Sequence, residues 1–191
     1  MLDIFQGFDF SILDFIYNYI RCDFLDPIMA GASYFASNGI GWIVLGFILL
    51  IPRKTRAAAA TALVAIAIGF FFGEVVIKNI VCRIRPYDAY EAFHCAVMPF
   101  SLNAGKETSF SFPSGHTCCS FASAISCFKI NRKVGLITLF AAGLIGFSRL
   151  YNYVHYPTDV LGGMLLGICA GLLAIYIFKK LNLDNKIIKN I

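Results

Sequence analysis

Charged residues are scarce in this chain. They make up 14% of its 191 residues, whereas hydrophobic residues make up 59% and the mean hydropathy is +0.74. A typical soluble domain carries roughly 25% charged residues. So few charged side chains cannot cover the surface of a soluble fold, which excludes a soluble globular protein. A disordered chain is polar and rich in charge, so this composition excludes a disordered chain as well. The long apolar runs that remain are typical of a helical integral membrane protein rather than a barrel.

Sequence patterns for bound metal are also missing. The seven cysteines form no C-x-x-C pair and show no zinc-ligand spacing, and no carboxylate cluster suits Mg²⁺. We therefore expect neither a metal nor another cofactor. Whether Cys82 and Cys95, which share one polar loop, form a disulfide stays open. The net charge of +5 fits the basic loops of membrane proteins and does not indicate a nucleic-acid partner.

Five segments are apolar enough for us to expect membrane crossings, and they cover 27–51, 57–81, 112–129, 134–151 and 158–178. The sequence thus predicts one all-α membrane-embedded domain over residues 1–191, with a long loop at 82–111 and a tail at 179–191. Residues 4–20 are apolar but contain Asp9 and Asp14, and each carboxylate would cost roughly 2.5–3.5 kcal/mol at the bilayer centre. We expect an interfacial helix within 1–26, with a sixth span as the alternative.

The distribution of charge predicts the orientation in the membrane. One side of the predicted spans holds a single acidic residue, Asp184, and a set of basic residues: Arg53, Lys54, Arg56, Lys129, Arg132, Lys133, Lys179, Lys180, Lys186 and Lys189. The other side is rich in acidic residues. By the positive-inside rule the tail and the short loops face the cytoplasm, and the loop 82–111 faces outward. The plasma membrane is the expected location.

Three polar clusters lie at the outward ends of the predicted spans. They are Lys78 with Arg85-Pro86, then Pro113-Ser114-Gly115-His116, then Ser148-Arg149 with His155 and Asp159. Lys78, Arg85 and Arg149 bring three cations to one membrane face, and both residue types suit phosphate oxygens. A helix that begins at Ser114 and Gly115 adds backbone N–H groups that favour an anion. The clusters therefore predict a phosphate-binding site.

Two histidines accompany these cations. His116 and His155 are candidates for a general acid and a nucleophile. Pro157 suits the first position of a helix, which puts Asp159 one turn after His155, where a carboxylate can hold the imidazole in one tautomer. Each residue taken singly also has a structural interpretation, such as a snorkelling cation or a helix start. Their occurrence together, in this order and on one face, favours catalysis.

Several neighbouring residues have open roles. Glu74 precedes Lys78 by one helical turn and either orients it or balances its charge, and Ser148 is a second candidate for such support. Arg83 lies outside the clusters and is a candidate contact for a lipid headgroup. The glycines Gly162, Gly163 and Gly167 could pack against a neighbouring chain, although the oligomeric state stays open.

The clusters match K-x6-R-P, P-S-G-H and S-R-x5-H-x3-D, so the sequence resembles the type 2 phosphatidic acid phosphatase superfamily of membrane lipid phosphatases. The resemblance implies that His155 forms a phosphohistidine, that Asp159 orients it, and that His116 protonates the leaving oxygen and then activates water. It also implies a phosphate-binding set: Lys78, Arg85, Ser114, Gly115 and Arg149. Three fixed cations can neutralise the phosphoryl oxygens, so we expect turnover without metal.

The expected substrate is a lipid phosphate or diphosphate at the outer membrane face. The resemblance to small bacterial members favours undecaprenyl diphosphate, the spent carrier of peptidoglycan synthesis, with phosphatidylglycerophosphate or phosphatidic acid as the alternative. A non-catalytic lipid-phosphate binder or carrier is an alternative of another class. Such a protein would be expected to lack one of His116, His155 and Asp159, and all three are present.

Overall fold

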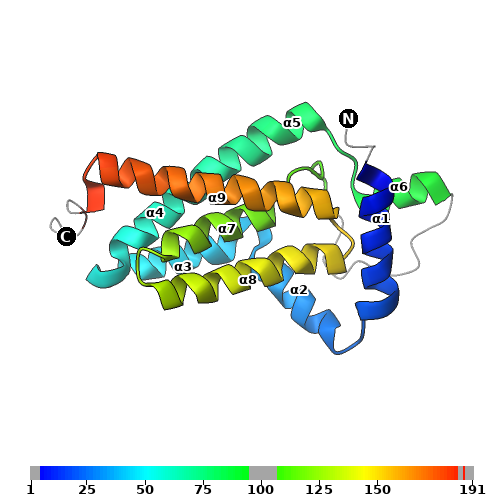
Figure 1. Ribbon diagram of the computed structural model, residues 1–191, viewed down its shortest axis with the longest axis horizontal. Helices are drawn as coiled ribbons and strands as arrows, with labels where there is room; N and C mark the ends of the chain where they lie inside the picture. The colour runs from blue at the N-terminus through cyan, green and yellow to red at the C-terminus, as the bar shows by residue number, and fades with distance from the viewer. Residues whose placement is uncertain (1–4, 95–106, 185–186, 188–191) are drawn as a thin grey trace.

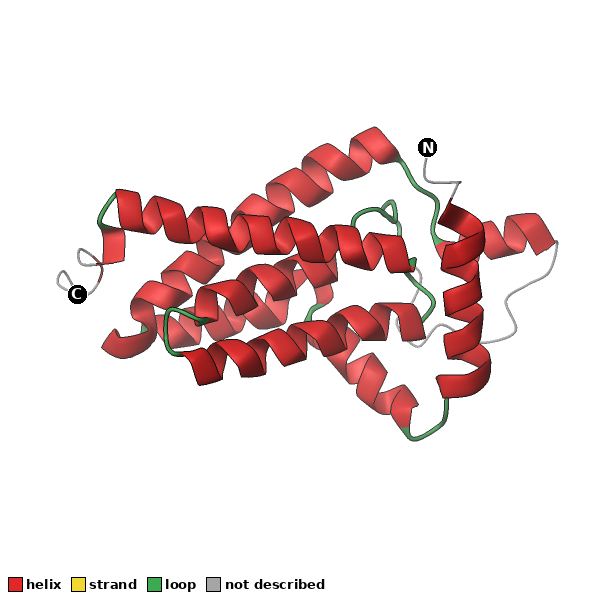
Figure 2. Cartoon of the chain, viewed as in Figure 1, coloured by secondary structure: helices red, strands yellow, loops and turns green. Residues whose placement is uncertain are grey.

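The computed structural model describes residues 5–94, 107–184 and 187, and the regular secondary structure in these ranges is helical. The elements are α1 (Gln6–Phe15) with a π-helical turn (Ile16–Ile20), α2 (Leu25–Phe35), a 3-10 turn (Ser37–Gly39), α3 (Ile40–Leu50), α4 (Arg53–Phe70), a π-helical stretch (Phe71–Ile77), α5 (Lys78–Val81), α6 (Pro86–His94), α7 (Gly115–Cys127), α8 (Arg132–Tyr151) and α9 (Pro157–Lys180). Together they form an elongated helical bundle (Figure 2).

Helix α7 lies in the middle of the bundle and packs against α4, α8 and α9 (Figure 1). It has 13 residues and is buried along most of its length, so it is shorter than the span expected at 112–129. A helix of this length is typical of a protein core rather than of a membrane crossing in contact with lipid. A Cβ atom at Gly163 would meet the carbonyl of Ser114, the N-cap of α7, and one at Gly167 would meet the Cys118 carbonyl within α7, so these two glycines allow close packing inside the chain.

Three described stretches are long and apolar enough to cross a membrane: Arg53–Tyr90, Arg132–Tyr151 and Pro157–Lys180. The segment expected to span at 27–51 is instead two helices, α2 and α3, bent by 62°, which would supply a fourth crossing if they form one span. Gly39 takes a left-handed conformation with a φ of 72° at the start of α3, where a side chain would be disfavoured.

Helix α1 lies across the end of the bundle at which α9 begins and contacts α9 (Figure 1). It is not among the candidate spans found in the described residues. Asp9 is fully buried and pairs with Arg83 inside the protein. Asp14 is exposed and accepts a hydrogen bond from the Tyr153 hydroxyl at 2.8 Å. Cys95 lies outside the described residues.

Candidate active site

The three polar clusters meet at one end of the bundle. Lys78 begins α5, Ser114 caps the start of α7, Arg149 lies in the last turn of α8, and His155 and Asp159 lie at the start of α9. Antiparallel connection of α8 and α9 explains part of this arrangement, because a short turn brings the end of one helix to the start of the next. The side chains expected from the sequence to share a site therefore come from four separate elements.

His155 lies between a carboxylate and a guanidinium group. Its Nδ1 is 3.5 Å from Asp159 Oδ2, and its Nε2 is 3.2 Å from a guanidinium nitrogen of Arg85. The tautomer that fits these partners carries its proton on Nδ1, which leaves a lone pair on Nε2. Burial, together with the positive charges of Arg85 and Arg149, lowers the pKa of His155 well below 6.5. The ring is therefore neutral at physiological pH, the form in which an imidazole nitrogen keeps its lone pair.

The Asp159 carboxylate is held by several donors. Its Oδ2 accepts from the Ser111 hydroxyl at 2.5 Å and from the Tyr156 backbone N–H at 2.9 Å, while Oδ1 accepts from Arg83 at 2.6 Å. Sequence analysis did not single out Ser111, because a serine in a loop has no distinguishing pattern. The hydrogen bonds fix the carboxylate beside His155.

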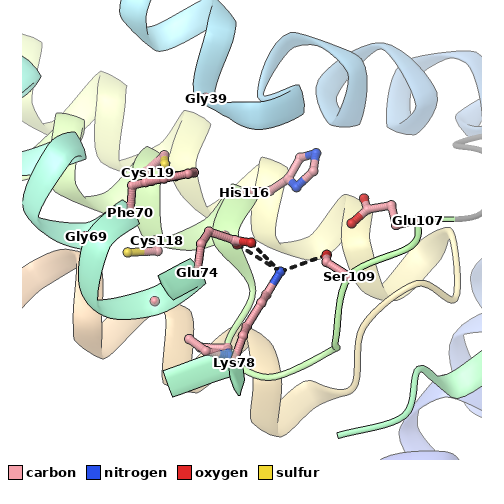
Figure 3. A pocket seen from close by; sticks show the side chains of 13 residues that line it. Gly39, Gly69, Phe70, Glu74, Lys78, Glu107, Ser109, His116, Cys118 and Cys119 are labelled. Carbon is pink, nitrogen blue, oxygen red and sulfur yellow. Dashed lines mark hydrogen bonds and ion pairs between the residues drawn. The ribbon is translucent and has the colours of Figure 1, made fainter. Parts of the chain in front are cut away.

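Lys78 is anchored by two partners in the pocket. Its ammonium contacts both oxygens of Glu74, at 2.8 and 2.9 Å, and donates to the Ser109 hydroxyl at 3.1 Å (Figure 3). Glu74 therefore both contacts Lys78 and balances its charge. Gly115 lies against Glu74, where a Cβ atom would overlap the carboxylate. The Ser109 hydroxyl also accepts from Arg85 at 3.0 Å, so Ser109 joins two of the cations.

Glu107 bridges the two arginines. One carboxylate oxygen is 2.7 Å from Arg85 Nη2, and the other contacts Arg149 Nη2. Burial alone would raise the pKa of Glu107, but the guanidinium groups of Arg149 and Arg85 outweigh it and lower the pKa to about 2. An anion thus already lies between these cations. Glu107 falls within the loop expected at 82–111, and nothing in the local sequence pairs it with residues so far along the chain.

The remaining expected site residues have simpler surroundings. Ser114 is fully buried, and its hydroxyl accepts hydrogen bonds from Thr117 as the N-cap of α7. Ser148 donates to the Ile145 carbonyl of its own helix at 2.7 Å, so the structure gives it an intrahelical partner. His116 lines the pocket that Lys78 and Glu107 also line (Figure 3). The described ranges contain no group of three or more His, Cys, Asp or Glu side chains arranged to hold a metal ion.

Comparison with known proteins gives consistent matches. A family model described as the PAP2 superfamily matches residues 58–183. An undecaprenyl-diphosphatase from Sulfolobus acidocaldarius is 30% identical over 90% of this chain and 79% of its own length. A decaprenylphosphoryl-5-phosphoribose phosphatase from Mycobacterium tuberculosis is 33% identical over 74% of this chain and 73% of its own. The crystal structure of a PAP2-type phosphatidylglycerolphosphate phosphatase from Bacillus subtilis has a TM-score of 0.71 at 28% identity, covering 92% of this chain and 86% of that one.

Proposed function

The chain belongs to the PAP2 superfamily of membrane lipid phosphatases, and on that premise we propose that it hydrolyses undecaprenyl diphosphate to undecaprenyl phosphate and inorganic phosphate. Two relatives of this multi-pass membrane protein, the undecaprenyl-diphosphatase and the decaprenylphosphoryl-5-phosphoribose phosphatase, are named for polyprenyl lipids, which supports this substrate class. The fold it shares with a phosphatidylglycerolphosphate phosphatase supports the phospholipid as a second candidate.

One observation carries the proposed chemistry: His155 has its Nδ1 beside Asp159 and its Nε2 beside Arg85. Nε2 attacks the terminal phosphorus, a P–N bond forms, and the bond from phosphorus to the bridging oxygen breaks. His116 gives its proton to the departing lipid phosphate. In the second half His116 takes a proton from water, the water oxygen attacks phosphorus, and the P–N bond breaks to release phosphate and His155.

The three cations perform the electrostatic part of this reaction. Lys78, Arg85 and Arg149 would bind the phosphoryl oxygens and neutralise the charge that they carry in the transition state. Arg149 Nε is buried and has no hydrogen-bond partner among the described residues, so it can donate to a bound phosphoryl group. The backbone at Ser114 and Gly115 contributes the N-terminus of α7. We propose that this arrangement works without a metal.

We also propose that the domain crosses the membrane five times, with the active site facing outward. The α2–α3 pair forms one bent crossing, α7 forms a crossing enclosed by other helices, and α1 lies in the outer interface. The site is at the end of the bundle remote from the basic residues Arg53, Lys129 and Lys179, and the positive-inside rule supports a cytoplasmic location for those residues.

Phosphate release by the purified protein in detergent tests the substrate. Undecaprenyl diphosphate and phosphatidylglycerophosphate are supplied side by side in the presence of EDTA, with His155→Gln as the control. We expect release that is faster from the polyprenyl lipid and absent in the variant. Faster release from the phospholipid would assign the second candidate. Release that stops with EDTA would contradict turnover without metal, and the absence of release from either lipid would favour a binder or carrier.

Trapping of the phosphoenzyme tests the mechanism. His116→Asn removes the group that activates water, so it is expected to accumulate phosphate on the protein from substrate labelled in its terminal phosphate. The label is expected to be acid-labile and to disappear in the double variant that also carries His155→Gln. A label that persists in the double variant would assign the nucleophile elsewhere.

A further inference from the structure

We propose that Asp9 and Arg83 position the catalytic carboxylate Asp159, so that the N-terminal helix α1 is a functional part of the active site. This inference rests on the proposed function, because it assigns Asp159 the task of orienting His155. The sequence analysis treated Asp9 as an interfacial acid and Arg83 as a candidate headgroup contact. The structure gives both residues other partners.

Arg83 joins the two carboxylates through separate nitrogens. Nη1 is 2.6 Å from Asp159 Oδ1, and Nη2 is 2.6 Å from Asp9 Oδ2. The guanidinium group also lies over the ring of Tyr156, 3.8 Å from its centroid. The Arg83 side chain is only 9% exposed. Its donors are thus directed at two buried carboxylates, so Arg83 has partners inside the protein and does not need a lipid headgroup as its partner.

The carboxylate of Asp9, which lies on α1, is held by Thr158 at the start of α9. Its Oδ1 accepts from the Thr158 backbone N–H at 3.1 Å, and its Oδ2 accepts from the Thr158 hydroxyl at 2.7 Å. The Arg83 Nη1 donates to the same Thr158 hydroxyl at 2.7 Å. An acid at a helix N-terminus is favoured by the free N–H groups there. Asp9 therefore fixes both Arg83 and the residue that precedes Asp159.

These contacts determine how Asp159 faces His155. With Oδ1 held by Arg83, Oδ2 is left to Ser111, the Tyr156 N–H and the imidazole Nδ1. A buried carboxylate without such partners would be costly and free to rotate. Asp9 also balances the charge of Arg83. Without the Asp9 charge, Arg83 would be paired with Asp159 alone, which would weaken the action of Asp159 on the histidine.

Kinetics of charge-removing variants test the proposal. Asp9→Asn keeps the shape of the side chain and removes its charge, and Asp14→Asn is the matched control, because Asp14 also lies on α1 and is bonded to Tyr153 rather than to Arg83. For undecaprenyl diphosphate in detergent, we expect Asp9→Asn to lower kcat about tenfold, with KM and the inhibition constant of inorganic phosphate within about twofold of wild type. We expect Asp14→Asn to leave all three within about twofold.

Two further variants separate positioning from simple loss of structure. Arg83→Gln removes the charge, whereas Arg83→Lys keeps it but has a single ammonium for two carboxylates. We expect kcat to fall in the order wild type, Arg83→Lys, Arg83→Gln, with phosphate inhibition unchanged. If Asp9→Asn does not fold, Arg83→Lys decides by the same criteria.

The outcomes distinguish this inference from the proposed function. If Asp9→Asn and both Arg83 variants keep the wild-type kcat while His155→Gln is inactive, the inference is overturned and the proposed function stands. A change in phosphate inhibition equal to the loss of kcat would overturn it too, because Arg83 would then be a phosphate ligand. Turnover that survives in His155→Gln would instead refute the proposed function itself.

Discussion

Glu107 lies 2.7 Å from Arg85 through one carboxylate oxygen and contacts Arg149 through the other. Two oxygens of an anion thus bridge two guanidinium groups, which is the contact that the proposed reaction requires of a phosphoryl group. In this structure a carboxylate from the protein occupies the Nη2 donors of both arginines. A substrate phosphate that uses the same donors must displace it.

Glu107→Gln is therefore expected to tighten the binding of inorganic phosphate, measured as a competitive inhibitor, by about tenfold. The amide keeps the size of the side chain but loses the charge that competes with phosphate. Asp26→Asn is the control, because Asp26 pairs with Arg21 at 3.3 Å and accepts a hydrogen bond from the Tyr151 hydroxyl at 2.7 Å. Unchanged or weaker inhibition in Glu107→Gln would show that the carboxylate does not compete.

Stability is expected to fall at acidic pH because of His155. The unfolded chain protonates this histidine near pH 6.5, whereas burial and the adjacent arginines keep its pKa far lower in the folded protein. The unfolded state then binds more protons, so stability is lost as the pH falls below about 6.5, by at most about 1.4 kcal/mol per pH unit.

Thermal melting in detergent, followed from neutral to mildly acidic pH, measures this contribution. His155→Gln lacks the titrating group. Its melting temperature is therefore expected to fall less than that of the wild type over the pH range in which His155 is neutral in the folded protein. Equal losses in the two proteins would mean that His155 takes up its proton without unfolding.

Ser111→Ala is expected to reduce kcat about tenfold with little change in KM. Ser111 donates to Asp159 Oδ2 at 2.5 Å, the same oxygen that faces His155, so its loss loosens the carboxylate. Ser123→Ala is a matched control, since Ser123 is buried and donates to the Cys119 carbonyl of its own helix at 2.9 Å. If steady-state kinetics gave the two variants equal rates, Ser111 would be without influence on the site.

Gly167→Ala is expected to destabilise the protein by about 1–3 kcal/mol, the usual cost of overpacking. A Cβ atom at Gly167 would meet the Cys118 carbonyl of α7, and a backbone atom there cannot move aside without separating the helices. Gly143→Ala on α8 is the control, because a Cβ atom there has no neighbour within 4 Å. Melting temperatures in detergent compare the two variants, and equal values would contradict close α7–α9 packing.

Much of the site could be predicted because its residues occur in fixed patterns. The spacing from His155 to Asp159 and the proline between them predict a carboxylate in the first turn of a helix, and the structure has it there. The apolar runs likewise predicted α8 and α9 to within a few residues. The span at 27–51 was predicted less well, because the short polar turn Ser37–Gly39, with Gly39 in a left-handed conformation, separates α2 from α3 within an otherwise apolar stretch.

The sequence by itself determined the class of the protein, the helices that carry the site and the residues available for phosphate chemistry, since composition and local spacing decide these. Only the tertiary structure decided that Glu107 bridges two arginines and that Arg83 joins Asp9 to Asp159. Asp9 and Thr158 are 149 positions apart, yet they share two hydrogen bonds. Such pairings depend on how whole helices pack, and no local pattern encodes them.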